Sequence, residues 1–366
     1  MPKRRPAKKR SPAAAVLLAV LCLLLLAVSR YLDSRSEPAA SVSAPEAAQA
    51  DAPKLEVHFL DIGQGDSALL FCGDETLLID GGKVKNNQKL IARLKELEVD
   101  HLDAVICSHP DEDHCGGLSA VLASTRTDAF YCSVDSWHTK VFSDVTKYVE
   151  QQGISVTVPQ AGDTFAFSDA SVEFLGPVVD YGDDPNEGSL VARVRYGETS
   201  FLFTGDMGFE AEDDMLAAGV DVSATVLKVA HHGSAGSSST EFLQAVHPQY
   251  AVISVGADND YGHPTEAALN RLAACGIPVY RTDLLGEIIA VSDGKTVTMT
   301  TASSEAPSAD AASQPTGSYG YVGNSSSKVV HLASCGKLPG ESNRVYFASL
   351  DEALAAGYRK HAACLG

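Results

Sequence analysis

The sequence predicts an α/β protein built from layers of strands and helices, and three observations carry that prediction. Short apolar runs with the length of strands alternate with segments whose apolar residues repeat at helical spacing. The strand runs have helices on both sides along the chain, which is typical of layered α/β folds. At 366 residues, 45% of them hydrophobic, the chain is long enough to bury a large core.

The expected elements follow in order. Strands are predicted at 55–60, 68–72, 76–79, 104–107, 189–196, 200–204, 226–230, 250–255 and 287–291. Helices are predicted at about 208–218, 239–246 and 265–274, and at 88–97, where Leu90, Ile91, Leu94 and Leu97 share one face. The polar residues of interest fall just after strands, where loops can direct side chains into a shared cleft.

The N-terminus has the pattern of a targeting segment. A basic stretch precedes sixteen apolar residues at 13–28, so residues 1–32 are predicted to be a signal anchor or a signal peptide. By the positive-inside rule, the body of the chain is expected on the extracytoplasmic side of the membrane, or secreted if the segment is cleaved.

The rest of the chain is acidic. Beyond residue 35 it has 20 Lys and Arg against 46 Asp and Glu, a formal charge of −26. General electrostatic attraction to nucleic acid is therefore excluded, and a polyanionic substrate would need local attraction, for instance by bound cations.

Two stretches rich in Ala, Ser and Pro, 33–53 and 301–318, are predicted to be linkers. The second stretch separates a main domain at 54–300 from a small module at 319–366. Seven of the eight cysteines lie outside the apolar N-terminal run, without the spacing of a disulfide framework.

The strongest chemical signal is SHPDEDHCGG at 108–117, which places His109, Asp111, Asp113 and His114 on one tight loop after a buried strand. Four such side chains in six residues would repel one another or lie unsatisfied without a cation between them, so they predict a divalent metal site. A merely solvated acidic loop would need neither histidines nor the following Gly-Gly.

Three further segments fit the same site. An apolar strand ends in Gly205-Asp206, another ends in His231-His232, and His263 lies in a loop before a helix. Each is weak alone, because such residues often form turns, but together they favour a metal centre.

The order HxDxDH, GD, HHGS and GHP resembles the metallo-β-lactamase superfamily, and more narrowly the metallo-β-lactamase domain of the ComEC competence proteins. VHFLDIGQGDSALL (57–70) and LLIDGG (77–82) are similar to the same group. The resemblance covers residues 55–295. It implies a four-layer αβ/βα sandwich with its metal site at one edge of the two central sheets.

The resemblance also implies roles. His109 and Asp111 would bind one metal, Asp113 and His114 a second, Asp206 would bridge them and His231 would complete a shell. Asp113 is also a candidate catalytic residue, and His232 or His263 would bind metal or act as general acid. Residues expected to border the site or contact substrate are Asp61, Gln64, Asp66 and Asp80, which could instead only form turns, and Ser234 of GSAGSSS (233–239), a segment that could instead be a flexible loop with an N-cap serine.

The sequence departs from the wider superfamily at two places. Asp111 replaces a histidine, which makes Mn²⁺ a rival to Zn²⁺. The histidine expected between the first loop and the GD strand is missing, and the region reads DPNEGSLVA (184–192). Whether one or two metals bind is therefore left open.

The C-terminal module carries His331, Cys335, His361 and Cys364 in two close pairs, which fit a structural zinc site. The pattern resembles the zinc module of the Ada alkyl-DNA repair proteins, in which all four ligands are cysteines. With histidine at the first and third positions, a stabilising or interaction role is expected rather than repair.

The sequence thus predicts an extracytoplasmic metal-dependent hydrolase, a phosphodiesterase or nuclease acting on DNA or related phosphodiesters through a metal-bound hydroxide. The alternatives are an esterase for phosphocholine esters or lactones and a catalytically weak surface binding protein. Substrate, metal identity and oligomeric state are left open.

Overall fold

The computed structural model describes residues 54–257, 259–301, 321–332, 335, 337–340, 343–347 and 350–365. The predicted targeting segment, the linker at 33–53 and nearly all of the linker at 301–318 lie outside these ranges. No helix within the described ranges is both long enough and apolar enough to cross a membrane.

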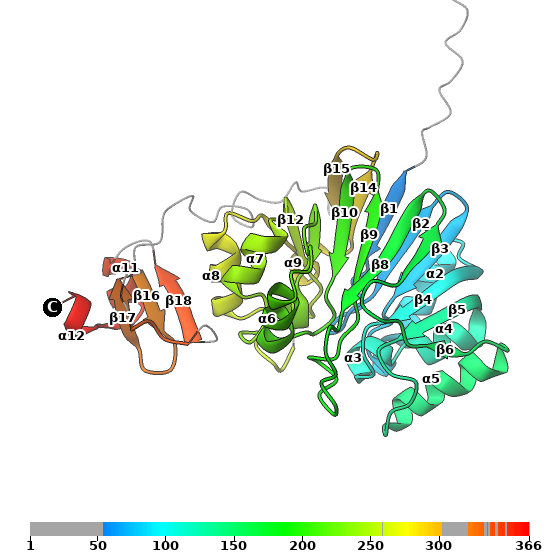
Figure 1. Cartoon of the computed structure of the whole chain (residues 1–366), viewed down its shortest axis with the longest axis horizontal. Coiled ribbons are helices and arrows are strands. Elements are labelled where there is room, and N and C mark those ends of the chain that lie inside the picture. The colour runs from blue at the N-terminus through cyan, green and yellow to red at the C-terminus, as the bar shows by residue number, and fades with distance from the viewer. Residues whose placement is uncertain are drawn as a thin grey trace, which may run out of the picture. The chain divides into compact units, whose positions relative to one another are not determined.

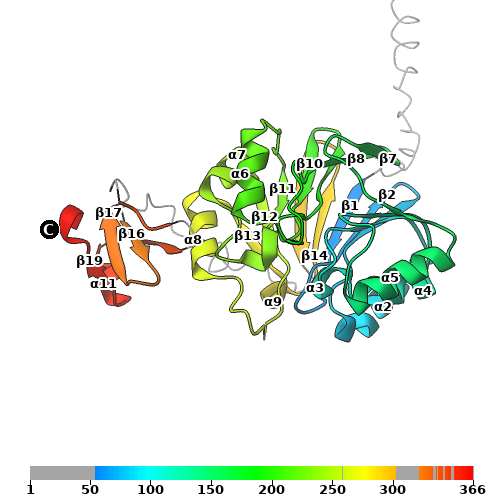
Figure 2. The same cartoon turned by 60° about the horizontal axis from the view of Figure 1, so that its bottom comes forward.

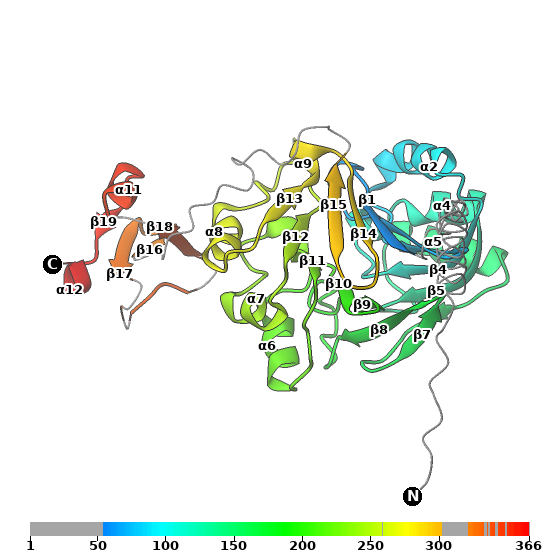
Figure 3. The same ribbon diagram turned by 90° about the horizontal axis from the view of Figure 1, so that it is seen from above.

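Two large sheets form the centre of the main domain (Figure 1). The first has the order β15-β14-β1-β2-β3-β4-β5-β6. Its strands are β1 (Leu55–Phe59), β2 (Ala68–Cys72), β3 (Glu75–Ile79), β4 (His101–Cys107), β5 (Arg126–Cys132), β6 (Val156–Thr157), β14 (Ile288–Ser292) and β15 (Val297–Thr301). Figure 3 shows β14 and β15 beside β1, so the end of the domain returns to its beginning.

The second sheet has the order β13-β12-β11-β10-β9-β8-β7. Its strands are β7 (Thr164–Phe167), β8 (Ala170–Gly176), β9 (Val191–Tyr196), β10 (Thr199–Phe203), β11 (Val226–Lys228), β12 (Tyr250–Ile253) and β13 (Val279–Arg281). Strands β10 to β13 are parallel to one another, so their carboxyl ends lie along one edge.

Helices cover the outer face of each sheet (Figures 1 and 2). Over the first sheet lie the short helix η1 (Val84–Asn86), α2 (Asn87–Glu96), α3 (Glu112–Cys115), α4 (Leu118–Ser124) and α5 (Lys140–Gln151). With the second sheet lie α6 (Phe209–Ala217), η2 (Ala230–Gly233), α7 (Thr240–Val246), α8 (Glu266–Ala274) and α9 (Thr282–Leu285).

Alternating side chains along the strands create the layers. In β10, Phe201 and Phe203 enter the core between the sheets, whereas Leu202 packs in the core beneath α6 and α7. In β2, Leu70 faces the central core and Leu69 the core beneath α2, α4 and α5. This period of two gives three apolar cores between four layers, so the predicted αβ/βα sandwich is confirmed.

The C-terminal module has its own four-stranded sheet, in the order β18-β16-β17-β19. Its elements are β16 (Tyr321–Asn324), β17 (Val329–Leu332), β18 (Arg344–Phe347), β19 (Arg359–Lys360), α11 (Leu350–Ala355) and α12 (Ala362–Leu365). Among the described residues of the module, the buried apolar cluster consists of Val330, Val345, Phe347, Ala353 and Tyr358. Such a small core gives limited stability by itself.

Candidate metal centre

The predicted site residues follow strands of both sheets and meet at one edge. Asp80 follows β3, His109 follows β4, Asp206 follows β10 and the two histidines of HHGS follow β11 within η2. Because these strands are parallel to their neighbours, their carboxyl ends bring the loops together. The predicted polar loop at 108–117 contains the short helix α3, which carries Asp113 and His114.

Close packing of glycines fixes this loop. A Cβ atom on Gly117 would lie 2.0 Å from the carbonyl oxygen of Gly81. The two segments are joined by hydrogen bonds from Gly117 N–H to Gly82 O (2.8 Å) and from Gly81 N–H to His114 O (2.7 Å). The Gly-Gly that follows HxDxDH is therefore required for α3 to pack against the LLIDGG segment.

Asp80 orients His114. The fully buried His114 ring has Nδ1 2.9 Å from Asp80 Oδ2, and Asp80 also accepts hydrogen bonds from the backbone N–H (2.7 Å) and hydroxyl (2.8 Å) of Ser108. The Nε2 atom of His114 is left facing Asp206 Oδ1 at 3.0 Å. A carboxylate behind the other ring nitrogen is the usual support of a metal-binding histidine.

Asp206 lies at the middle of the centre. Its Oδ2 atom is 3.6 Å from His231 Nε2 and 3.7 Å from His232 Nε2, and the latter is 3.7 Å from Asp113 Oδ2. Its carboxylate thus faces His114 through one oxygen and the HHGS pair through the other.

His109 and Asp111 complete the first loop. His109 Nε2 is 3.9 Å from Asp111 Oδ2, and the His109 and His114 ring centroids are 4.1 Å apart. Burial lowers the pKa of His109 to about 3, with His114 adding to the effect, so its imidazole is neutral. Burial raises the pKa of Asp111, and Asp113 adds to the shift.

Several atoms at this centre are buried without a hydrogen-bond partner. They are Nε2 of His109, Nε2 of His114, Nε2 of His232 and Oδ1 of Asp206. Leaving so many converging polar atoms unsatisfied would be costly, whereas imidazole nitrogens and carboxylate oxygens are the ligands of divalent cations such as Zn²⁺ and Mn²⁺. The residues present therefore fit a metal centre.

When no cation is bound, the histidines and carboxylates of the centre shift one another's pKa values. Burial opposes charge on His114 and His232, but nearby carboxylates outweigh it. Asp206 and Asp80 raise the pKa of His114 well above its usual value, and Asp206 and Asp66 raise that of His232 to about 9. In turn His114 and His232 hold the pKa of the buried Asp206 far below its usual value.

Asp66 is held by a lysine that the sequence interpretation did not single out. Lys228, at the end of β11, places Nζ 2.6 Å from Asp66 Oδ2, and both side chains are buried. Asp66 Oδ1 is 3.1 Å from His232 Nδ1, which donates to Ser254 O at 2.9 Å. Asp66 belongs to a four-residue group of potential ligands with His114, Asp206 and His232. Its pairing with Lys228 suits a residue that borders the site, which is one of the roles expected for it.

The other predicted residues divide between the centre and its surroundings. His263 lies beside the HHGS pair, with ring centroids 5.6 Å from His231 and 6.5 Å from His232, and burial lowers its pKa to about 4. Gln64 is buried and accepts from Gly256 N–H at 3.2 Å. Asp61 instead pairs with Lys89 at 2.9 Å.

Hydrogen bonds fix the segment that follows HHGS. Ser234 Oγ accepts from Gly236 N–H, and Ser239 is the N-cap of α7, accepting from Phe242 N–H at 3.1 Å, as one of the two interpretations predicted. The final serines are buried rather than loosely exposed. Buried Arg271 donates to the carbonyls of Ser237 (2.6 Å) and Ser238 (2.8 Å).

Ser189 occupies the region where the superfamily histidine is missing. It is fully buried, and its hydroxyl accepts a hydrogen bond from Asp206 N–H at 3.1 Å. A serine therefore positions the backbone of the central carboxylate from this segment.

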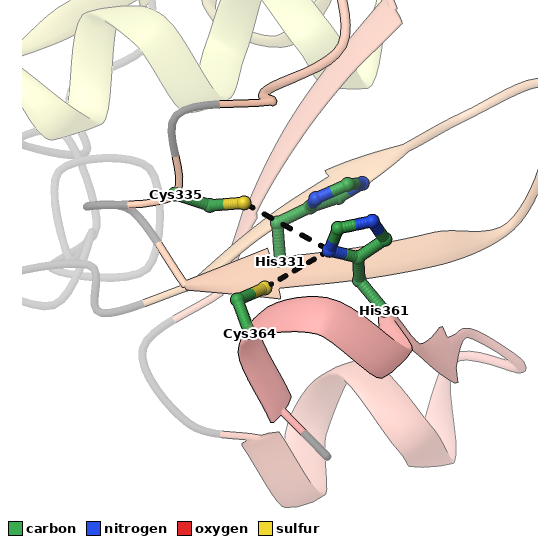
Figure 4. A group of neighbouring side chains, drawn as sticks. All are labelled: His331, Cys335, His361 and Cys364. Carbon is green, nitrogen blue, oxygen red and sulfur yellow. Dashed lines mark hydrogen bonds between the residues drawn. The ribbon is translucent and has the colours of Figure 1, made fainter.

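A second cluster lies in the C-terminal module (Figure 4). His361 Nδ1 is 3.2 Å from Cys364 Sγ and 3.8 Å from Cys335 Sγ, and the His331 ring stacks on that of His361 with centroids 4.0 Å apart. The ligand atoms of all four residues lie within 4.8 Å of one another. The predicted set is thus brought together and is compatible with a zinc module.

Comparison with known proteins gives the following similarities. A family model described as "Metallo-beta-lactamase superfamily" matches residues 60–257. "ComE operon protein 3" of Bacillus subtilis (strain 168) is 31% identical over 251 residues, covering 64% of this chain and 32% of that protein. "Competence protein ComA" of Neisseria gonorrhoeae is 33% identical over 285 residues, covering 76% and 38%. The matched part thus spans about a third of each relative.

The metallo-beta-lactamase fold protein YhfI of Bacillus subtilis, a solved structure, is 14% identical with a TM-score of 0.47. The match covers 66% of this chain and 100% of that one.

Proposed function

Because this chain belongs to the metallo-β-lactamase superfamily, we propose that it is an extracytoplasmic metal-dependent hydrolase that cleaves phosphodiester bonds in DNA or a related substrate. The observation that carries the hydrolase is the convergence of unsatisfied imidazole and carboxylate atoms from separate loops of both sheets. The competence proteins among the relatives, together with "Recombination protein 2" of Haemophilus influenzae, 30% identical over 248 residues, favour DNA.

The geometry suggests which residues would hold the cations. His109 Nε2 faces Asp111 Oδ2, and His114 Nε2 faces the Oδ1 atom of Asp206. Asp113, with the HHGS histidines, lies toward its Oδ2 side. Divalent cations held here would activate water as a nucleophile and withdraw charge from the substrate.

The charges around the centre suit an anionic substrate only when cations are present. Asp66, Asp80, Asp111, Asp113 and Asp206 contribute five negative charges, and the nearby Lys228 and Lys83 contribute two positive ones. One divalent cation would leave a single formal negative charge, and two would make the centre positive. A phosphodiester would then be attracted locally despite the acidic surface.

The protein supplies orientation and a candidate for proton transfer. His232 is committed at both nitrogens, since Nδ1 donates to Ser254 O and Nε2 faces Asp113 and Asp206. His263 lies beside it with Nδ1 buried and without a hydrogen-bond partner. Because the low pKa of His263 keeps its imidazole neutral, we assign to Nδ1 the role of accepting a proton or binding a cation.

Activity measurements on the purified protein test this function. Single-stranded and duplex DNA, RNA, bis(p-nitrophenyl) phosphate, a phosphocholine ester and a lactone would each be incubated with Zn²⁺ or Mn²⁺. We expect turnover of the phosphodiesters and at least a roughly 100-fold loss in Asp206→Asn and His114→Ala. His138→Ala is the matched control, because His138 contacts Trp137 rather than the centre.

Three results would contradict the proposal. Equal turnover in wild type, Asp206→Asn and His114→Ala would remove the metal mechanism. Hydrolysis of only the lactone or the phosphocholine ester would replace the phosphodiesterase with the alternative esterase, and cation binding without turnover of any substrate would favour the weak binding protein.

The proposed location rests on the basic and apolar N-terminal sequence. Protease treatment of intact cells, compared with lysed cells, tests it. We expect the main domain to be digested, or found in the medium, when cells are intact. Protection until lysis would contradict an extracytoplasmic location.

We further propose that the C-terminal cluster binds one structural Zn²⁺ through His331, Cys335, His361 and Cys364. The small apolar core of this module supports a need for such a ligand.

A further inference from the structure

Tyr261 is an exposed aromatic side chain close to the metal centre. It lies in the loop between β12 and α8, and 58% of it is accessible to solvent. Asn259 orders residues 259–263: its Nδ2 donates to Gly256 O (2.9 Å) and His263 O (2.6 Å), and its Oδ1 accepts from Tyr261 N–H (3.2 Å) and His263 N–H (3.0 Å). An exposed ring on a turn held by such hydrogen bonds can bind a flat ligand at little entropic cost.

Two contacts link Tyr261 to the centre. Its ring is stacked with that of His263, with centroids 5.8 Å apart and planes 26° from parallel, and His263 in turn packs on His231. Lys83 Nζ donates to the Tyr261 hydroxyl at 3.1 Å and lies 3.8 Å from Asp113 Oδ2. A single ammonium group therefore stands between the phenol and a candidate metal ligand.

A nucleotide offers the two groups that this arrangement could bind. Bases stack on exposed aromatic rings in proteins that bind single strands, without requiring a particular sequence. An ammonium group is a point charge that pairs with phosphate oxygens. Lys83 supplies such a group, with Nζ 3.1 Å from the Tyr261 hydroxyl and 3.8 Å from Asp113 Oδ2.

We propose that Tyr261 and Lys83 form a nucleobase subsite at the rim of the metal centre. The base next to the scissile phosphodiester stacks on Tyr261, and Lys83 pairs with an oxygen of that phosphate. The subsite rests on the proposed phosphodiesterase function and narrows its substrate to nucleotides with an accessible, unpaired base.

Two esters with the same leaving group separate base recognition from chemistry. One is the p-nitrophenyl ester of thymidine 5′-phosphate, and the other is methyl p-nitrophenyl phosphate, which has no base. We expect Tyr261→Ala to lower kcat/KM for the thymidine ester about tenfold and to change the methyl ester less than about twofold. Tyr261→Phe, which keeps the ring, should stay near wild type on both, and Lys83→Met should lower both.

The control is Leu284→Ala, which removes an apolar side chain of similar exposure, 59%, from α9. Melting temperatures of all variants verify folding. The hydrolysis rates of oligothymidylate, oligouridylate and a cyclic nucleotide are then compared between wild type and Tyr261→Ala. The substrate whose rate falls most is the one that depends most on the Tyr261 ring.

The outcomes separate the two proposals. If the wild-type protein hydrolyses both esters and Tyr261→Ala affects them equally, or affects neither, the subsite is wrong while the phosphodiesterase stands. If the wild-type protein hydrolyses neither ester nor any oligonucleotide, the phosphodiesterase and the subsite are both overturned.

Discussion

Replacing Lys228 by methionine removes the cation from the buried ion pair beneath the centre. Lys228 and Asp66 are 4% and 5% exposed, and Lys228 Nζ also donates to Val229 O at 2.8 Å. Methionine fills similar space without charge. The substitution therefore leaves the Asp66 carboxylate without the ammonium at 2.6 Å and the Val229 carbonyl without this donor.

The expected cost is large. Removing one partner of a buried ion pair costs roughly 3–5 kcal/mol in unfolding free energy, because the remaining charge stays desolvated. For a domain of this size each kcal/mol lowers the melting temperature by about 2–4 °C, so Lys228→Met should lower it by roughly 6–20 °C. The double variant Lys228→Met with Asp66→Asn should recover much of this loss, because no uncompensated charge remains.

Thermal unfolding in the presence of a chelator measures the effect. The fluorescence of the single tryptophan, Trp137, reports on the main domain. Lys140→Met is the matched control, because Lys140 is 85% exposed and its pair with Asp144 should contribute little. The reasoning is refuted if Lys228→Met has the same melting temperature as Lys140→Met, or if the double variant is no more stable than Lys228→Met alone.

Two further predictions concern Glu212 and the C-terminal cluster. Burial raises the pKa of Glu212 from 4.5 to about 7, so the folded state binds this proton more tightly and the stability it contributes is lost as pH rises from about 4.5 to about 7. Relative to the non-titrating Glu212→Gln, the unfolding free energy in urea should therefore fall by roughly 2–3 kcal/mol between pH 5 and pH 8, and a constant difference would contradict this. Cys335→Ser should lower the zinc content of the purified protein by one per chain, whereas Asp206→Asn should leave that zinc in place; unchanged zinc in Cys335→Ser would exclude the cluster as its ligand.

The layers could be predicted because each core depends on a local pattern. The continuous apolar runs of β2 and β10, which are buried on both faces, and the helical period in α2 are visible in the sequence. Between residues 118 and 188 no element was predicted, so β5, α5 and β8 were missed although they are of ordinary length. The elements β6 and α9 were also missed, because so few residues give too little periodicity.

The candidate ligands could also be predicted, since HxDxDH, GD and HHGS place metal-binding residue types directly after strands. Their supports were harder to foresee. In the sequence, Lys228 is an ordinary basic residue at the end of a strand, and Arg271 has the pattern of a residue on the exposed face of a helix. In the structure, both are buried by segments that are distant in sequence. The role of Ser189 depends on the packing of its segment against Gly205 and Asp206, which no local pattern reveals.

The central claim is that side chains from both sheets share divalent cations. Anomalous diffraction from crystals grown with Zn²⁺ or Mn²⁺, collected on both sides of the metal's absorption edge, measures this directly. The account predicts at least one peak within coordination distance of both His114 Nε2 and the Asp206 carboxylate. Metal-loaded crystals with no peak between these two residues would contradict it.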